Sequence, residues 1–142
     1  MLSYVHWCLG DVEQAITLGE YALRENRALG FSRHSEAAVL AGLDFYQESV
    51  GAWAAAAENL AEARAGFLGL GTYSDSLIAQ SVEARCMLAL ERYEEARKLA
   101  GEVWGYIREH GSAGIFFPGR VYVAIADVAT PLITNMQVSP CD

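Results

Sequence analysis

The sequence predicts an all-α fold of about seven helices arranged as antiparallel pairs. The first observation is that residues 1–117 contain no proline, since the three prolines stand at 118, 131 and 140. Proline interrupts the hydrogen bonds of a helix interior, so its absence favours long helices. The second is an abundance of strong helix formers, such as the alanine run at residues 54–57. The third is an internal repeat, which indicates stacked structural units.

The repeat becomes visible when the sequence is shifted by 41 and then by 40 residues. Each shift brings like residues into register, in an alanine column (Ala15, Ala56, Ala96), a turn column (Gly10, Gly51, Glu91) and a second glycine column (Gly30, Gly71, Gly111). The second glycine column predicts the ends of long helices, because glycine adopts the left-handed terminating conformation without steric cost. The turn column predicts the tight turn within each pair. The alanines let a neighbouring helix approach closely.

We expect helices at about residues 1–9, 12–29, 34–49, 52–69, 74–90, 92–110 and 117–129, because apolar residues recur at helical spacing in each of them. The first helix stops just before Gly10 and the second just before Gly30. The third stops shortly before Gly51 and the fourth shortly before Gly71. The glycines therefore alternate between a turn inside a pair and a turn between pairs.

The last three helices depend on additional signals. We expect Ser74, Asp75 or Ser76 to cap the fifth helix, because short polar side chains accept hydrogen bonds from the first backbone N–H groups. The sixth helix runs between the turn and glycine columns. Pro118 suits the start of the seventh helix. Thr130–Pro131 falls where the following turn is expected, so the seventh helix is predicted to end at about residue 129.

The chain is therefore expected to be a single domain, 1–142, with repeats at about 1–31, 32–71 and 72–111 and a lone capping helix at 117–129. The first helix begins abruptly and the fourth repeat is incomplete. Both features lead us to expect a fragment of a larger protein, or an array in which one helix serves as a cap.

Residues 10–16, followed by Ala22 and Leu23, resemble the second half of a tetratricopeptide (TPR) repeat, in which a glycine and an acidic residue open the second helix. Residues 90–96 are a second copy, with Glu91 in place of the glycine, and residues 51–56 are a third. The resemblance covers the chain to about Val128. It implies a TPR-like α-solenoid, in which antiparallel helix pairs form a right-handed superhelix.

The spacing of the columns resembles a long variant of this family, with a period of about 40 residues in place of the usual 34. That variant occurs in the repeat tails of bacterial LuxR-like and maltose-activator-type transcription regulators. It also occurs in adenylate or guanylate cyclases that carry an ATPase module, and residues 4–32 look especially like the cyclase tail. The resemblance implies a regulatory domain of such a protein.

The charge of the chain excludes two classes of partner. The net charge is -8, with 10 basic residues against 18 acidic ones. Nucleic acids and anionic membranes both require clustered positive charge, so we expect neither as a partner. No apolar run reaches the roughly 18 residues of a membrane span, and no signal peptide is visible. An odd number of cysteines without metal or redox spacing suits reduced thiols, which predicts a cytoplasmic location.

No set of residues indicates catalysis or a bound metal. His6, His34 and His110 have no second ligand at metal spacing. The sequence contains neither a phosphate-binding glycine loop nor a Gly-x-Ser-x-Gly motif. Cys86 lies in an apolar stretch and is interpreted as a small core residue. We therefore expect a protein that is not an enzyme, with no cofactor and no metal.

The resemblance also implies a binding surface. In stacked helix pairs, the first helix of each pair lines a concave groove. The positions that match groove positions of the family are Tyr4, Trp7, Phe45, Glu48, Arg85 and Leu88. Aromatic residues together with arginine are typical of interaction hot spots. The spacing of the three aromatic residues suits packing between repeats equally well, so both placements stay open.

Two functional hypotheses follow. The first is a non-catalytic interaction or regulatory scaffold that binds a protein or peptide, as part of a multidomain bacterial signalling or transcription-regulatory protein. The alternative is a ligand-sensing domain whose groove binds a small molecule or short peptide, with Arg85 pairing with an anionic group. Self-association as a homodimer, through apolar helix faces exposed at the ends of the array, is a further hypothesis.

Overall fold

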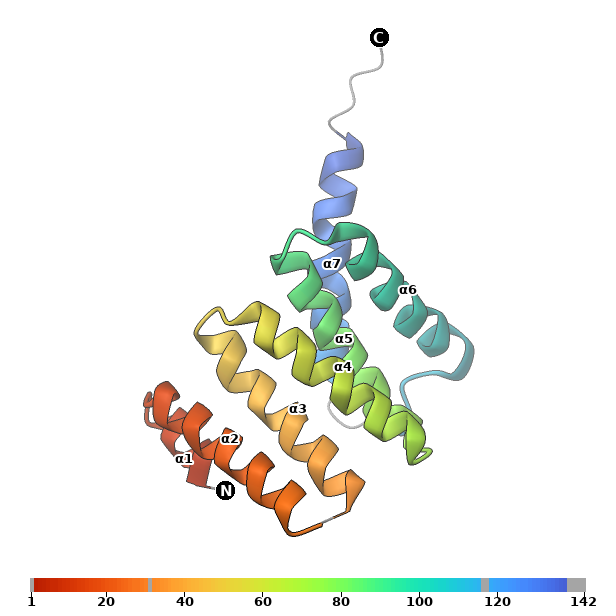
Figure 1. Cartoon of the computed structure of the whole chain (residues 1–142). Helices are drawn as coiled ribbons and strands as arrows, with labels where there is room; N and C mark the ends of the chain where they lie inside the picture. The colour runs from red at the N-terminus through yellow and green to blue at the C-terminus, as the bar shows by residue number, and fades with distance from the viewer. Residues whose placement is uncertain (1, 31, 116–117, 138–142) are drawn as a thin grey trace.

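The computed structural model describes residues 2–30, 32–115 and 118–137, and every regular element within these ranges is a helix (Figure 1). The helices are α1 (Leu2–Cys8), α2 (Val12–Ala28), α3 (Arg33–Ser49), α4 (Trp53–Gly69), α5 (Tyr73–Ala89), α6 (Tyr93–His110) and α7 (Pro118–Gln137). The predicted all-α class is confirmed. The bounds of α1–α6 lie within one residue of the predicted ones at both ends.

The turns between the helices have the backbone conformation that the two glycine-rich columns predicted. Each of the six turns contains a residue with a positive φ angle. In the turns after α1, α3 and α5 these residues are Gly10 (83°), Gly51 (73°) and Glu91 (61°). In the turns after α2, α4 and α6 they are Gly30 (65°), Gly71 (75°) and Gly111 (77°). Glu91 is the only residue other than glycine with a positive φ in the described part of the chain. A side chain is disfavoured in this region, so Glu91 is a strained copy of a glycine turn.

The predicted caps of α5 were wrong. The N-cap residue is Thr72, and Ser74, Asp75 and Ser76 all lie inside the helix. The Thr72 hydroxyl donates a hydrogen bond to the carbonyl of Phe67 (3.1 Å) in the preceding helix. The Thr72 hydroxyl therefore stabilises the turn between α4 and α5, and Thr72 makes no side-chain cap hydrogen bond to α5.

Helices α1 to α6 each pack against the next helix along the chain, so that they lie side by side with alternating direction (Figure 1). The three alanines of the repeat column, Ala15, Ala56 and Ala96, are each 0% exposed. The largest apolar cluster extends from α3 to α6 and also includes Val128 of α7. The centre of the molecule is α5, which packs against α4, α6 and α7.

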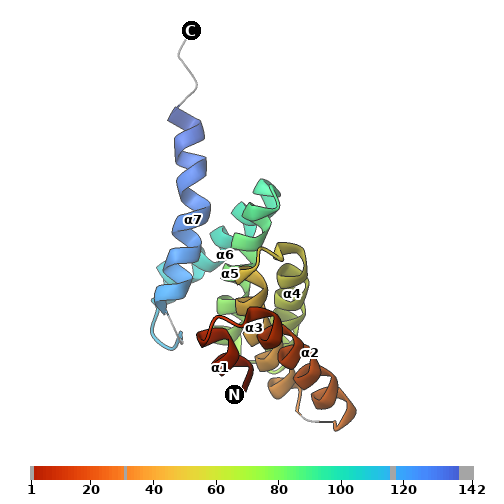
Figure 2. The same cartoon turned by 90° about the vertical axis from the view of Figure 1, so that its left-hand side faces the viewer.

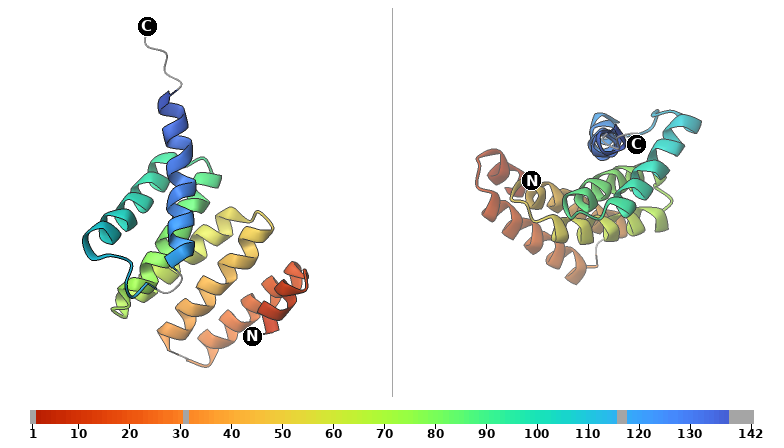
Figure 3. Two further views of the ribbon diagram at one scale, coloured as in Figure 1. Left: turned by 180° about the vertical axis from the view of Figure 1, so that it is seen from behind. Right: turned by 90° about the horizontal axis from the view of Figure 1, so that it is seen from above.

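Helix α7 departs from this serial arrangement. It packs more extensively against α5 than against α6, its neighbour in the chain. Figure 2 shows it standing along one side of the other helices. Figure 3 shows α1–α6 as an arc, with α7 on the inner side of that arc. We call the surfaces of α3 and α5 that meet α7 the inner face.

The predicted end of the last helix at residue 129 was also wrong, because α7 continues through Thr130–Pro131 to Gln137. Proline lacks the N–H that would bond to the carbonyl four residues earlier, so it removes one hydrogen bond from the helix. The Thr130 hydroxyl donates to the carbonyl of Ala126 (2.8 Å), which keeps its side chain bonded within the helix. One missing bond therefore does not end α7.

Candidate interaction surface

Five charged side chains meet where α7 lies on the inner face. Asp44 and Glu48 stand one turn apart on α3, Arg85 stands on α5, and Arg120 and Asp127 stand two turns apart on α7. Arg120 Nη2 lies 2.7 Å from Asp44 Oδ2 and 3.5 Å from Glu48 Oε2. Arg85 Nε lies 3.1 Å from Asp127 Oδ2, and its Nη1 lies 3.8 Å from Glu48 Oε1. We call these five residues the inner-face charge cluster.

The cluster is most deeply buried where Arg120 meets α3. The side chain of Asp44 is 0% exposed, those of Glu48 and Arg120 are 12% and 18% exposed, and those of Arg85 and Asp127 are 30% and 46% exposed. A buried carboxylate is stable only with a partner, and removing that partner is strongly destabilising. Among the described side chains, Arg120 is therefore the main electrostatic anchor of α7, and Arg85 with Asp127 adds a weaker, more solvated contact.

An apolar stripe on α7 lies alongside these charges. Val121, Ala124 and Val128 are 0%, 0% and 2% exposed, and their spacing of three and four residues places them on one helix face. Val121 belongs to a cluster with Leu77 of α5 and Ile107 of α6. The residues are small, which lets α7 approach the inner face closely.

Of the six residues matched to the family groove, the structure brings two into the inner-face charge cluster. Glu48 and Arg85 pair with each other and with residues of α7. Leu88 is partly buried against the largest apolar cluster. The side chain of Phe45 lies outside the described residues. Two of the predicted groove positions, Glu48 and Arg85, are therefore already paired with residues of a helix of the same chain.

Tyr4 and Trp7 belong to a different group of aromatic residues, which joins α1 to α3. The Trp7 ring lies 5.9 Å from the Tyr4 ring and 6.4 Å from the Tyr46 ring, measured between centroids. Trp7 Nε1 also donates a hydrogen bond to Ser49 Oγ (2.9 Å). Trp7 is half-buried against α3, while Tyr4 remains exposed.

Sequence reasoning missed Asp44, Arg120 and Asp127. One signal for them existed, because residues 120, 121, 124, 127 and 128 form a continuous stripe on a helix. Asp44 and Glu48 form a matching acidic pair at i,i+4 on α3. Nothing in the local pattern showed that the two stripes face each other, since that depends on where α7 turns back.

Cys86, on α5, is fully buried, as its apolar surroundings predicted. Burial, with a smaller contribution from the nearby carboxylates of Glu48 and Asp44, raises the pKa of its thiol to about 12. Arg85 and Arg120 oppose this effect. The thiol is therefore protonated at neutral pH, and it lacks the exposure and the lowered pKa that a reactive cysteine requires.

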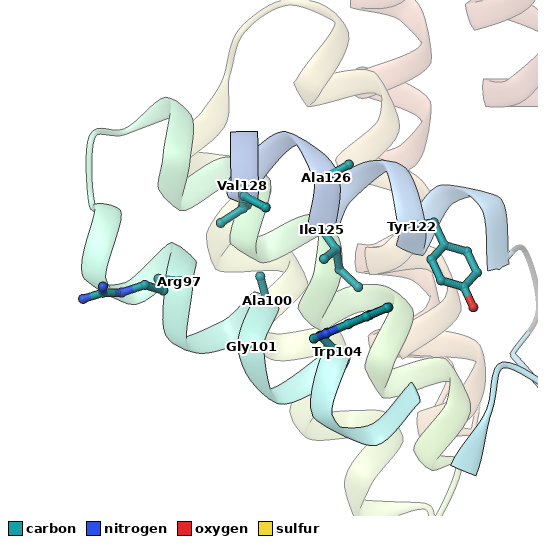
Figure 4. A pocket seen from close by; sticks show the side chains of 9 residues that line it. Arg97, Ala100, Gly101, Trp104, Tyr122, Ile125, Ala126 and Val128 are labelled. Carbon is teal, nitrogen blue, oxygen red and sulfur yellow. The ribbon is translucent and has the colours of Figure 1, made fainter. Parts of the chain in front are cut away.

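A groove of about 450 Å³ lies between α6 and α7, because α7 lies closer to α5 (Figure 4). Its lining is mainly apolar and consists of Arg97, Ala100, Gly101, Trp104, Tyr122, Ile125, Ala126, Val128 and Ala129. Trp104 and Tyr122 are 44% and 42% exposed. The face of α6 that looks toward α7 is thus only partly covered.

Comparison with protein-family models, curated proteins and solved structures finds no match to this chain. Within the described ranges, no group of three or more histidine, cysteine, aspartate or glutamate side chains is placed to hold a metal ion. In the same ranges, none of the helices combines the length and apolar character needed to cross a bilayer.

Proposed function

We propose that this chain is a non-catalytic scaffold built from TPR-like helical repeats, and that its inner face binds a helical segment of a protein partner. The observation that carries the proposal is α7 itself. It is a helix seated on α3 and α5 through one buried ion pair, one partly exposed ion pair and a stripe of small apolar residues. A surface that holds one helix in this way has the shape and charge to hold another of the same kind.

The repeated turns support a repeat scaffold. The turns after α1, α3 and α5 share a left-handed residue at equivalent positions, and the three repeat-column alanines share complete burial. Units that repeat their turns and their close contacts stack in a regular way. A regulatory role within a larger bacterial signalling or transcription-regulatory protein is part of the same proposal, and it rests on the sequence resemblance.

The arrangement around Arg85 favours a scaffold over a ligand sensor. The sensor hypothesis requires Arg85 to meet an anionic ligand. Arg85 lies between the carboxylates of Glu48 and Asp127, at 3.8 and 3.1 Å. Its charge is balanced in this arrangement, so an added anion would have to displace a carboxylate before it could pair.

The proposal is tested by selecting helical peptides from a random display library on the intact chain. The selected peptides are then titrated into the isotope-labelled chain, and backbone amide shifts are recorded by NMR. We expect the perturbed amides to lie on α3, α5 and α7, since these elements form the inner face. Perturbations confined to α2 and α4 would contradict the proposed binding surface.

A further inference from the structure

We propose that α7 is an internal ligand of the inner face, which it occupies in place of an amphipathic helix from a partner protein. The partner helix has the same charge spacing as α7: a basic residue followed, two turns later, by an acidic one. The inference rests on the proposed function, since it names the partner chemistry and the regulation of the same surface. Helix α7 blocks the inner face until the partner helix displaces it.

The charges of the inner face define which helix fits, and in which direction. At one end of the contact Arg120 forms ion pairs with Asp44 and Glu48, and at the other end Asp127 forms an ion pair with Arg85. Seven residues, or two helical turns, separate the two α7 charges. A helix bound in the opposite direction would place its acid against two carboxylates, which is repulsive. The inner face therefore selects both the spacing and the direction of its ligand.

The apolar stripe adds a limit on size. Val121, Ala124 and Val128 are buried where α7 packs on the other helices, and none of them is larger than valine. A partner helix therefore needs small or β-branched residues at the same positions relative to its basic residue, because a large side chain would hold it away from the charges. The partner is thus a helix with a basic residue, three small apolar positions and an acidic residue on one face.

In the part of α7 whose side chains the structure describes, few residues are buried in the core. Among its residues with described side chains, only Val121, Ala124 and Val128 are buried, whereas α5 buries ten residues. Elements with few buried contacts detach at low free energy. Because α7 is tethered by a short segment, it competes at an effective concentration on the order of millimolar. A partner must therefore bind more tightly than the tethered helix to open the site.

The test uses a fluorescent peptide with the sequence of residues 118–130 and three full-length chains: wild type, the double variant Arg120→Glu/Asp127→Arg, and the control Val123→Glu. Val123 is 56% exposed on α7, so its substitution leaves the helix seated. The double variant keeps Asp44, Glu48 and Arg85 but makes its own α7 repel them. Circular dichroism checks that each chain is folded, and fluorescence anisotropy measures binding.

We expect the peptide to bind the double variant at least tenfold more tightly than it binds wild type or Val123→Glu. A peptide that carries the same two charge reversals is expected not to bind the double variant. Equal affinity of the wild-type peptide for wild type and double variant would overturn the proposal. So would equal binding of the two peptides to the double variant. A wild-type chain that sediments as a dimer through exchanged α7 helices would also overturn it, because the occupant would then be a second copy.

If the double variant does not fold, Asp127→Ala takes its place. Asp127 is 46% exposed, so its loss removes only the weaker anchor. The expected gain in peptide affinity is then about two- to fivefold, the size of an exposed ion pair, and no gain would overturn the proposal. The two proposals can be distinguished by experiment. If library-selected helices perturb α3 and α5 but the α7 peptide binds no better to the variant, the proposed function stands and the internal-ligand proposal fails.

Discussion

At the scale of single residues, the turns decide where each helix stops, and Glu91 is the exception among them. It occupies the position of Gly10 and Gly51 and has a φ of 61°. The left-handed region costs a residue with a side chain about 1–2 kcal/mol. Glycine avoids that cost but loses about 0.5–1 kcal/mol in chain entropy. The balance favours glycine at this position.

We therefore expect Glu91→Gly to raise the free energy of unfolding by about 0.5–1 kcal/mol. Urea unfolding followed by circular dichroism measures it. The converse substitution, Gly51→Ala, is the matched control and should lower stability by about 1 kcal/mol, since it introduces the strain that Glu91 already has. A destabilised Glu91→Gly variant would show that the Glu91 side chain makes a contribution larger than the strain.

Cys86 gives the chain a specific dependence on alkaline pH. Burial raises the pKa of its thiol from an ordinary value of 9.0 to about 12. In the unfolded chain the thiol ionises above pH 9, while in the folded chain it stays protonated, so ionisation favours unfolding. The stability that Cys86 contributes is therefore complete below pH 9 and is lost as the pH rises from 9 towards 12.

Between pH 8 and 10.5 we expect wild type to lose about 2 kcal/mol more stability than Cys86→Ala, which has no thiol to ionise. Urea unfolding of both chains at the two pH values measures the difference. The comparison cancels the tyrosines and the lysine, which titrate in both. Identical losses would mean that Cys86 is accessible to solvent in the folded chain.

At the scale of elements, the most deeply buried ion pair between α7 and α3 in the described residues is that of Arg120 with Asp44. Breaking a buried ion pair by removing one of its two side chains costs about 3–5 kcal/mol. The chain can avoid most of that cost if α7 leaves and water reaches Asp44. We therefore expect Arg120→Ala to loosen α7 and to leave α1–α6 folded.

Hydrogen exchange measured by mass spectrometry tests this separation. In Arg120→Ala, the amides of residues 121–130 are expected to exchange at least tenfold faster, while those of α4 and α5 change little. Arg120→Lys should restore part of the protection, because it keeps the charge but not the guanidinium geometry. Arg108→Ala, at an exposed residue of α6, is the matched control and should leave α7 unchanged. Unaltered exchange of α7 in Arg120→Ala would contradict the role of this ion pair.

The elements also show what local sequence can predict. The bounds of α1–α6 followed from turn residues and apolar spacing, both of which act over a few residues. The end of α7 did not, because Pro131 removes only one hydrogen bond and the helix continues. The inner-face charge cluster did not either, since Asp44 and Arg120 are 76 residues apart and meet only through the position of α7. Glu48 and Arg85 were identified by resemblance, but their contacts with α7 were not.

At the scale of the whole molecule, α1–α6 depend on neighbours in the chain, so stability should vary along it. Where helices pack mainly against their neighbours in the chain, the helix at an end has fewer contacts and unfolds first. Helix α1 has seven residues and packs mainly against α2, with a smaller aromatic contact to α3, whereas α5 packs against three helices. We expect amide protection to be highest in α4 and α5 and lowest in α1. Uniform protection across α1–α6 would indicate a single cooperative unit instead.

Both the proposed binding surface and its internal ligand depend on the position of α7 on the inner side of the arc. The most direct measurement is a set of methyl nuclear Overhauser effects in the intact, methyl-labelled chain. We expect cross-peaks from Val121, Ala124 and Val128 to methyl groups of α5. Cross-peaks confined to α7 and α6, with none to α5, would show that α7 lies beside α6 alone, and would contradict its placement on the inner face.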